Sequence, residues 1–345
     1  MSYTASAVSP RDSRAQRQVD ALLTQEGIRR DGNLDYTCGI FDDDWQLVAT
    51  GSCFGNTIRC LAVDHAHQGE GLLNQVVSHL MGVQFERGNS HVFLYTKAST
   101  AHFFGDLGFY EIARVSGTLV FMENRRTGFA DYCRALERGP AGRTAAVVMN
   151  ANPFTLGHRH LLETAASEND CVHLFLLSEE AGPIPFAVRK RLALAGIAGL
   201  DNVIYHDSGA YIISAATFPT YFLKDADDAI RAHASLDLAV FGRIAAALGV
   251  TRRYVGKEPT SRVTALYNEI MAERLPEMGV ACKIIPRVAV NGRIVSASTV
   301  RQAIHDGALA SVADMLPETT LRYFESPEAA PVVAAIRAEK DVVHY

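Results

Sequence analysis

The sequence predicts an α/β protein of two domains, the second of which contains a parallel sheet. The chain has 345 residues, which is too long for one typical domain and fits two. Residues 139–142 read Gly-Pro-Ala-Gly, and glycine and proline at this density break regular structure. After this seam, apolar strand-like runs alternate with helical segments, which is the pattern of a parallel sheet covered by helices.

Composition and charge exclude several classes of protein. Hydrophobic residues make up 48% of the chain and charged residues 21%, an ordinary globular balance. The net charge of −5 argues against a general nucleic-acid binder, which is usually basic. No apolar run approaches the ~18–20 residues that cross a bilayer, and the N-terminus lacks the apolar core of a secretory signal. We therefore expect a cytoplasmic protein that binds neither nucleic acid nor membrane.

The six cysteines give no sign of a metal centre. They are scattered, with no C-x-x-C pair and no spacing typical of metal ligands. Reduced and mostly buried thiols are the expected state.

Before the seam, strands surround one long amphipathic helix. Leu72, Val76 and Leu80 recur at helical spacing and mark the buried face of that helix. The expected elements are strands within residues 35–64 with a turn at 42–44, the helix within 67–88, a buried strand at 91–97, and a short helix that closes at Gly108.

After the seam, five strands alternate with five helices. The expected strands are residues 145–149, 172–177, 202–206, 253–256 and 283–286. The expected helices lie near residues 158–167, 187–198, 226–248, 262–274 and 298–306. In open parallel sheets, ligands bind at the carboxyl ends of the strands.

One such strand end carries an anion-binding pattern. Residues 147–160 read "VVMNANPFTLGHRH", which compresses a strand, a polar turn and a helix start into fourteen residues. A helix N-terminus offers unpaired N–H groups and partial positive charge, a natural seat for phosphate. Gly157 would let the backbone approach a ligand closely, and Thr155 and His158 would point into the same pocket. Helix capping is the simpler interpretation of His158 taken alone.

A second helix start repeats the pattern. Residues 295–304 read "VSASTVRQAI" and bring three hydroxyls, of Ser296, Ser298 and Thr299, to a helix N-terminus with Arg301 in its first turn. Ordinary capping would explain this segment by itself. Two such seats in one α/β unit indicate a single phosphate-bearing ligand between them.

The two segments together resemble motifs of the nucleotidyltransferase superfamily. They resemble its H-x-G-H and I-S-S-T-x-x-R motifs, with Thr155 in place of the first histidine and with Val295 and Ala297 in the second. The stretch "FAVRKRL" is similar to the superfamily's F-S-x-E-x-R-L, with Arg189 in place of the usual acid. The resemblance implies a Rossmann-like domain that attacks the α-phosphate of ATP and releases pyrophosphate.

Four blocks narrow the resemblance to one family. The segments "VMNANPFTLGHRHLLETAA", "YIISAATFPTYFLK", "VGKEPTSRVTALYNEIM" and "VSASTVRQAI" look like the citrate lyase ligases, over about residues 36–321. This implies that ATP and acetate form acetyl-adenylate and pyrophosphate. The acetyl group then moves to the prosthetic-group thiol of the citrate lyase acyl carrier (gamma) subunit, a group similar to dephospho-coenzyme A, which activates the lyase.

The resemblance also implies roles for residues. His158 and the N–H groups of its turn would stabilise the α-phosphate, with Thr155 and Arg301 as the other catalytic residues. Ser296, Thr299 and Arg301 would hold the pyrophosphate, with Mg²⁺ that arrives on ATP. The further ATP-binding residues would be Asn152, Phe154, Gly157, Arg191, Lys257 and Ser298. Lys257 and Glu258 could equally be a solvated loop pair, and Arg262 and Tyr267 a surface ion pair and a core aromatic.

The first half is similar to GNAT acetyltransferases. Their R/Q-x-x-G-x-G/A loop wraps the pyrophosphate of coenzyme A at a helix N-terminus. Gly69 and Gly71 match that loop, whereas Ala66 stands at its usual basic or amide position. We expect Gln68, Gly69 and Gly71 to hold the prosthetic arm of the carrier; a relic fold kept for stability or docking is the alternative.

These resemblances set the expected domains and leave rival functions open. We expect a GNAT-like α+β domain at residues 1–130, a linker at 131–143, a nucleotidyltransferase domain at 144–325 and a tail at 326–345. The rivals are an adenylyltransferase for a phosphate-bearing substrate, an acetyltransferase with an accessory nucleotide-binding domain, and a non-catalytic regulator that binds ATP and a partner.

Overall fold

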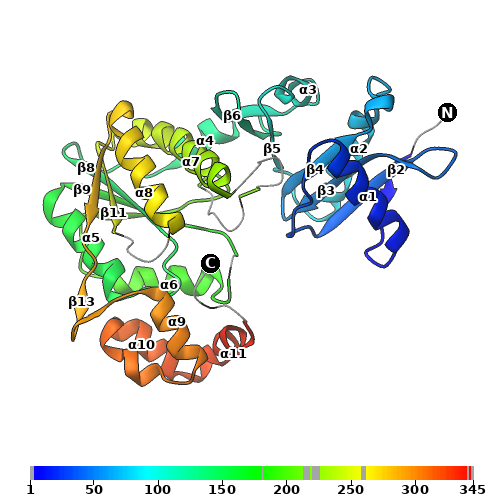
Figure 1. Ribbon diagram of the computed structural model, residues 1–345. Helices are drawn as coiled ribbons and strands as arrows, with labels where there is room; N and C mark the ends of the chain where they lie inside the picture. The colour runs from blue at the N-terminus through cyan, green and yellow to red at the C-terminus, as the bar shows by residue number, and fades with distance from the viewer. Residues whose placement is uncertain are drawn as a thin grey trace. The chain divides into compact units, whose positions relative to one another are not determined.

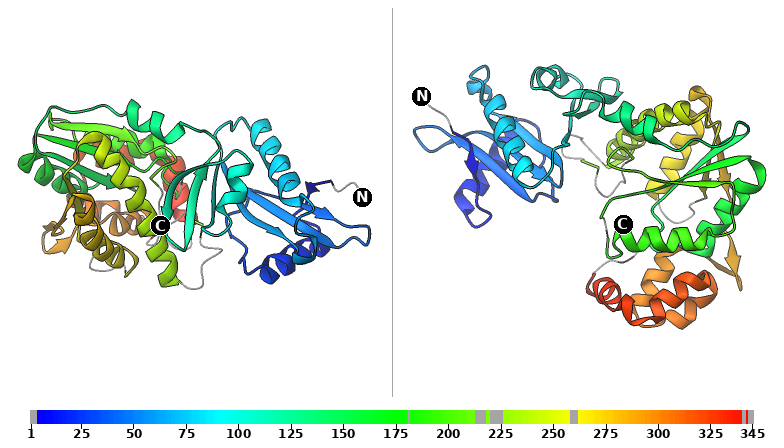
Figure 2. Two further views of the ribbon diagram at one scale, coloured as in Figure 1. Left: turned by 90° about the horizontal axis from the view of Figure 1, so that it is seen from above. Right: turned by 180° about the vertical axis from the view of Figure 1, so that it is seen from behind.

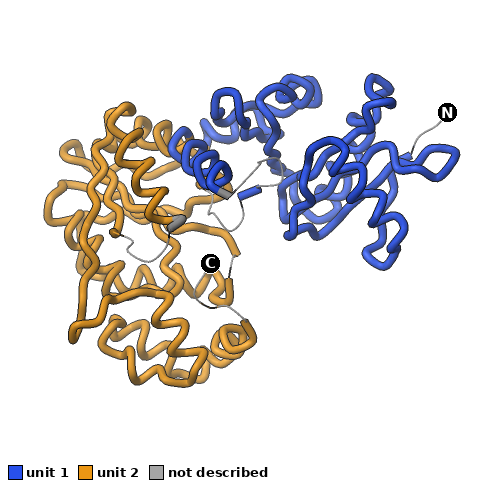
Figure 3. The backbone as a smooth tube through the Cα atoms, viewed as in Figure 1, with its two compact units in different colours: residues 1–131, 218–239 blue, residues 132–217, 240–345 orange. Residues whose placement is uncertain are grey.

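The chain folds as two compact units. The computed structural model describes residues 4–180, 182–212, 218–219, 226–257, 262–339 and 342. Unit 1 comprises Met1–Asp131 and Phe218–Ala239, and unit 2 comprises Tyr132–Thr217 and Val240–Tyr345 (Figure 3). Part of the long helix α7 (Ala226–Leu248) therefore belongs to each unit.

Unit 1 is built on a seven-stranded sheet of order β1-β2-β3-β4-β5-β7-β6. Neighbouring strands are antiparallel except β4 and β5, which are parallel. The strands are β1 (Ser6–Ala7), β2 (Tyr36–Phe41), β3 (Leu47–Phe54), β4 (Thr57–Val63), β5 (Phe93–Lys97), β6 (Tyr110–Val115) and β7 (Leu119–Glu123). The helices are α1 (Ser13–Gln25), α2 (Leu72–Glu86) and α3 (Ala101–Asp106) (Figure 1).

Helix α2 packs on β2, β3 and β4 through the face that the sequence predicts. Leu72, Val76 and Leu80 are all buried on it. The β4–β5 ladder joins residues 57–58 to 93–94 only, so the two strands part soon after they begin. Strand β4 then leads through η1 (His65–His67) into the glycine loop that starts α2. This α+β unit agrees with the expected GNAT-like fold.

Unit 2 contains the predicted parallel sheet, of order β10-β9-β8-β11-β12. Its strands are β8 (Thr144–Met149), β9 (Cys171–Leu176), β10 (Val203–Asp207), β11 (Arg252–Gly256) and β12 (Ala281–Ile285). Its helices include α4 (Gly128–Ala135, which begins in unit 1), α5 (Leu156–Glu168), α6 (Phe186–Gly196), α8 (Arg262–Arg274) and α9 (Ala297–His305). The alternation predicted from the sequence is confirmed.

The strand order changes direction at β8. The chain moves from β8 outward to β9 and β10, then returns to the other side of β8 with β11 and β12. The β8–β11 ladder pairs residues 145–147 with 252–254, so these strands part before either ends. Ligands of open α/β sheets bind at such a switch point, at the carboxyl ends of the strands.

A helical cluster follows the sheet. A hairpin of β13 (Ala289–Val290) and β14 (Arg293–Ile294) leads into α9, and η3 (Leu309–Met315), α10 (Glu318–Glu325) and α11 (Ala330–Ala338) follow (Figure 2). Residues 326–345, which the sequence analysis set apart as a tail, contain α11. Val332, Ile336 and Val342 belong to the same buried core as the sheet, so the described residues of this segment, 326–339 and 342, pack as part of unit 2.

Candidate active site

The turn between β8 and α5 fixes the His158 imidazole by two hydrogen bonds. Thr155 is the N-cap residue of α5, and its backbone N–H donates to Nδ1 of His158 at 3.0 Å. The Thr155 Oγ1 lies 2.9 Å from the same nitrogen. Because a backbone N–H can only donate, Nδ1 is the acceptor and the neutral ring carries its proton on Nε2. His158 thus offers one N–H donor away from its own turn.

The surroundings of the ring favour its neutral form. Burial lowers the pKa of His158 from 6.5 to about 4, and the charges of Arg287 and Arg301 act in the same direction. The Phe154 ring stacks on the imidazole, with 5.6 Å between centroids. A neutral Nε2–H donor beside two guanidinium groups suits a bound phosphate oxygen.

We expect His158 to remain neutral down to about pH 5. Since its folded pKa lies below the unfolded value, the unfolded chain takes up the proton first as pH falls below 6.5. The stability that the neutral ring contributes is complete above pH 6.5 and is lost as pH falls towards 4. Imidazole C–H resonances followed by NMR between pH 8 and 4 test this, with a His158→Asn variant for assignment; a midpoint near 6.5 would contradict it.

The start of α9 carries a compact group of hydroxyls. Ser296 is its N-cap residue and accepts a hydrogen bond from the Thr299 N–H at 3.1 Å. Its Oγ also lies 2.9 Å from the Ser298 hydroxyl and 2.8 Å from that of Thr299. Ser296 and Ser298 are partly buried and Thr299 is exposed. The predicted hydroxyls are therefore adjacent, at a helix N-terminus.

The two predicted seats lie next to each other. A Cβ atom on Gly157, in the first turn of α5, would come within 3.5 Å of the carbonyl oxygen of Val295, which directly precedes the α9 cap. Arg301 is buried, and its Nη1 donates to the carbonyl of Asn152 in the β8–α5 turn. Its Nε donates to the carbonyl of Val342 at 2.7 Å. The arginine thus ties α9 to the turn that holds His158.

One residue of the turn, Phe154, differs from its predicted role. Phe154 is fully buried, and its ring lies against Gly196 of α6, so it supports the imidazole from behind and presents no surface to ATP. A Cβ atom on Gly157 would contact Val295 at an ordinary van der Waals distance, so the two helix starts lie close together without requiring a glycine at this position.

Asn152 is buried with both ends of its amide unsatisfied within the described part of the chain. Such a group costs about 1–3 kcal/mol unless a ligand or water satisfies it, which is compatible with its predicted place in the ATP site.

The ends of β11 and β12 add a cation that sequence reasoning missed. The Lys257 N–H donates to the carbonyl of Ile285, and Arg287 Nε donates to the carbonyl of Lys257 at 2.8 Å. Arg287 acts electrostatically on His158, so it belongs to the same site. Its position directly after the predicted strand at residues 283–286 was the available signal. Glu258 and the side chain of Arg262 lie outside the described residues.

Arg191 lies apart from these groups. Its Nη1 donates to Glu328 at 2.6 Å in an exposed ion pair, and its guanidinium lies over the Tyr323 ring. In this structure Arg191 makes a surface contact between α6 and the segment after α10, and its phosphate role stays a prediction. Arg189, on the opposite side of the same helix, is fully buried.

In unit 1, residues 68–71 form an open loop at the start of α2. Gly69 and Gly71 have φ values of +88° and +77°, a backbone conformation that favours glycine. A Cβ atom on either would meet nothing within 4 Å. Gly71 is the N-cap residue and has no side chain to cap α2, so its first N–H groups need other partners. Glu70, within the loop, pairs with His67.

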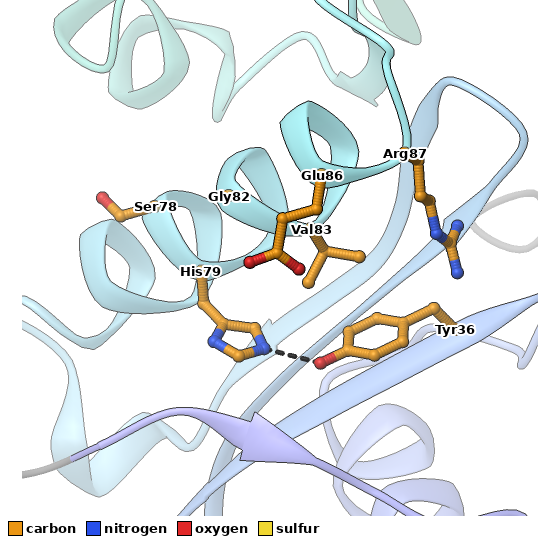
Figure 4. Close-up of a pocket in the computed structure, with 7 residues that line it drawn as sticks. All are labelled: Tyr36, Ser78, His79, Gly82, Val83, Glu86 and Arg87. Atoms are coloured by element: carbon orange, nitrogen blue, oxygen red, sulfur yellow. Dashed lines mark hydrogen bonds between the residues drawn. The ribbon is translucent and has the colours of Figure 1, made fainter.

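Two grooves are lined by none of the candidate site residues discussed above. Figure 4 shows the larger one, of about 550 Å³, where side chains of α2 face the start of β2 and Tyr36 bonds to His79 at 2.6 Å. The other, of about 380 Å³, lies at the carboxyl end of β10 beside Lys190 and Asp207. Among the described residues there is no group of three metal-ligating side chains, and no helix long and apolar enough to span a membrane.

The fold and this site define an α/β protein with a candidate anion-binding site at the switch point of a parallel sheet. The family model of the citrate lyase ligase C-terminal domain matches residues 144–324. Over 320 residues the chain is 38% identical to the citrate (pro-3S)-lyase ligase of Klebsiella pneumoniae, covering 91% of this chain and 93% of that one. The Escherichia coli ligase is 36% identical over 328 residues, 92% and 93% of the two chains. This chain belongs to the citrate lyase ligase family.

The chain is also similar to solved structures of acyltransferases over about a third of its length. A putative acyl-CoA N-acyltransferase from Klebsiella pneumoniae has a TM-score of 0.29 and 18% identity, covering 35% of this chain and 95% of its own. A GNAT family N-acetyltransferase from Escherichia coli in complex with CoA has a TM-score of 0.29 and 19% identity, covering 36% and 83%.

Proposed function

We propose that this chain activates citrate lyase by acetylating the prosthetic-group thiol of its acyl carrier subunit at the expense of ATP. The overall reaction converts ATP, acetate and the thiol to AMP, pyrophosphate and the thioester. One observation carries the proposal: within a citrate lyase ligase chain, the starts of α5 and α9 adjoin at the sheet's switch point and Arg301 ties them together.

In the first step, an acetate oxygen attacks the α-phosphorus of ATP. The bond from that phosphorus to the bridging oxygen breaks, and pyrophosphate leaves with the electron pair. Acetate is a poor nucleophile towards an anionic triphosphate, so charge must be offset on both sides of the phosphorus. The His158 Nε2–H and the N–H groups of α5 suit the α-phosphate. The hydroxyls of Ser296, Ser298 and Thr299 suit the leaving pyrophosphate.

The charges of the site fit a triphosphate. Arg287, Arg301 and Lys257 are cations, and Asn152 has an unsatisfied amide. Mg²⁺ bound to ATP would neutralise part of the phosphate charge and keep most of its waters. Arg301 already bonds two carbonyls, so we assign it to positioning the turn as well as to attracting the pyrophosphate.

In the second step, the thiol sulfur attacks the acetyl carbon of the adenylate. The acyl–phosphate bond breaks, AMP leaves with the electron pair, and the thiol proton passes to solvent. The carrier's arm contains a pyrophosphate, and the open loop of residues 68–71 at the start of α2 is suited to an anion. We assign this loop to holding the arm.

Gly69→Asp is expected to abolish acetyl transfer to the carrier and to leave acetate-dependent ATP–pyrophosphate exchange intact. The aspartate would add negative charge at the proposed pyrophosphate seat and strain a backbone with φ of +88°. Gly88→Asp is the matched control, because Gly88 has a φ of +82°, is equally open and lies at the other end of α2. Loss of both activities in Gly69→Asp would reject this division of labour.

Pyrophosphate release from ATP, measured with acetate and with or without the deacetylated carrier, tests the function. We expect acetate-dependent exchange without carrier, and net AMP formation with it. A dinucleotide product formed from a phosphate-bearing substrate would instead indicate another adenylyltransferase. Acetyl-CoA turnover without ATP would indicate an acetyltransferase, and ATP binding with no turnover a regulator.

A further inference from the structure

Arg189 is a buried cation at the carboxyl ends of β8 and β9. Its side chain is fully buried on α6. Its Nη1 donates to the Leu177 carbonyl after β9, at 2.9 Å, and its other nitrogens donate to the carbonyls of Glu179 and Ile184. Its Nη1 also donates to Asn150, the first residue after β8, at 2.8 Å from both the backbone oxygen and Oδ1.

Every hydrogen-bond acceptor of this guanidinium is a neutral oxygen. A loop anchor needs no charge, since neutral donors could satisfy these carbonyls at a lower desolvation cost. The carboxylates of Glu179 and Glu180 act on Arg189 only through space. A buried cation held in this way adds a positive field to the adjoining strand ends, and this field favours an anion there.

Arg189 also sets the orientation of the Asn150 amide. Because Oδ1 accepts from the guanidinium, the Nδ2 group must point away from Arg189. Asn150 is partly exposed, and no described residue accepts a hydrogen bond from its Nδ2. Arg189 therefore fixes the orientation of the amide, and its Nδ2–H group has no acceptor in the described part of the chain.

The position of Asn150 relative to the phosphate donors suggests which part of the substrates its amide would bind. The start of α9 lies beside the first turn of α5, and Arg287 bonds Lys257 at the end of β11. Both therefore follow the β11–β12 half of the sheet, on one side of β8. Asn150 is linked instead to the loop after β9, on the other side of β8, because Arg189 donates both to it and to the Leu177 carbonyl. In phosphoryl transfer, the attacking and leaving oxygens lie roughly in line on opposite sides of the phosphorus. If the pyrophosphate lies at the α9 start, the attacking acid should therefore lie on the β9 side of the α-phosphorus.

We propose that the Asn150 Nδ2–H group receives the carboxylate of the acid substrate, and that Arg189 is the positioning residue that aims it. This inference rests on the proposed function for the identity of the reaction. The same geometry would serve any small carboxylic acid, and the bond would orient one oxygen of the acid while the other attacks.

Asn150→Ala is expected to raise the KM for acetate roughly 10- to 100-fold, because a hydrogen bond to a charged group is lost. The KM for ATP should stay within about twofold. Asn150→Asp should raise the acetate KM further, since its carboxylate would pair with Arg189 and repel the substrate. Unchanged acetate KM values in both variants would overturn the inference.

A double-mutant cycle tests the positioning role. Arg189→Lys should raise the acetate KM in the parent chain and have no further effect in the Asn150→Ala background, whereas a merely structural role would multiply the two effects. Lys190→Arg is the matched control on the same helix, because it keeps the charge of an exposed ion pair with Asp207, and it should leave the acetate KM unchanged. Multiplicative effects would remove Arg189 from this role.

Acetate binding, measured by NMR with an ATP analogue that cannot be cleaved between the α- and β-phosphates, separates this inference from the proposed function. Absent exchange with retained acetate binding that Asn150→Ala weakens would defeat the function and support the acid site. Exchange in the parent chain with undiminished acetate binding in Asn150→Ala would support the function and defeat the acid site.

Discussion

Replacing His158 with alanine is expected to lower the rate of acetate-dependent ATP–pyrophosphate exchange by roughly 10²–10³-fold, the usual effect of removing one preorganised donor to a developing charge. The Thr155 N–H and hydroxyl hold the ring in the tautomer whose Nε2 carries the proton. Since that donor would bond the α-phosphate most strongly as its charge increases, the loss should fall on kcat more than on the KM for ATP. Steady-state exchange kinetics measure both.

His160→Ala is the control for this change. His160 lies two residues further along α5, and its backbone carbonyl accepts a bond from the Thr164 hydroxyl as part of the helix. We expect its substitution to change the exchange rate by less than about twofold, as for most sites away from the chemistry. Equal losses in the two variants would indicate damage to α5 and would refute a catalytic role for His158.

Arg301→Met is expected to destabilise unit 2 by about 2–5 kcal/mol and to abolish most exchange activity. The substitution removes donors to two carbonyls, of Asn152 and Val342, and leaves buried acceptors unsatisfied at about 1–3 kcal/mol each. The turn that carries His158 would also lose its tie to α9. Denaturant unfolding followed by far-UV circular dichroism measures the loss of stability, and exchange kinetics measure the loss of activity.

Two further arginine variants sharpen this test. Arg322→Met, on α10, removes only an exposed ion pair with Glu318, so we expect a change within about 1 kcal/mol. Arg301→Lys keeps the charge but cannot reproduce the two-armed bonding, so it should recover stability only in part. If Arg301→Met were as stable as Arg322→Met, the proposed tie between α9 and the His158 turn would be wrong.

Much of the fold could be predicted from the sequence because its signals are local. The parallel strands β8 to β12 are short apolar runs, and the helices between them carry periodic apolar faces. Elements with weaker local signals were missed: helix α1, the two-residue strand β1, and the β6–β7 pair. The first is a mainly polar helix with a narrow buried face. Strands β1 and β7 pair with β2 and β5, which are distant in sequence, and β6 is an edge strand that pairs with β7.

The site was predicted in part for the same reason. Thr155, His158, Ser296 and Arg301 stand within recognisable helix starts, and helix starts are read from neighbouring residues. The sequence was a poor guide to the two arginines at positions 189 and 191, which are two residues apart on α6 and make different contacts. Arg191 matched a motif yet bonds an exposed glutamate, whereas Arg189 departed from it yet joins the two loops that follow β8 and β9.

The sequence by itself determined the strand–helix alternation, the two helix starts with their hydroxyls and histidine, and the glycines of the α2 loop. Each of these depends on periodicity or on backbone conformation within a few residues. Only the tertiary structure decided that the two helix starts adjoin, that Phe154 supports the imidazole, and that Arg287 lies at the ends of β11 and β12 while Asn150 bonds to Arg189 beside β9. These contacts join residues that are distant in sequence. They form only in the folded chain, because β9 and β11 pair in parallel with β8 and bring the residues after each strand to the same edge of the sheet.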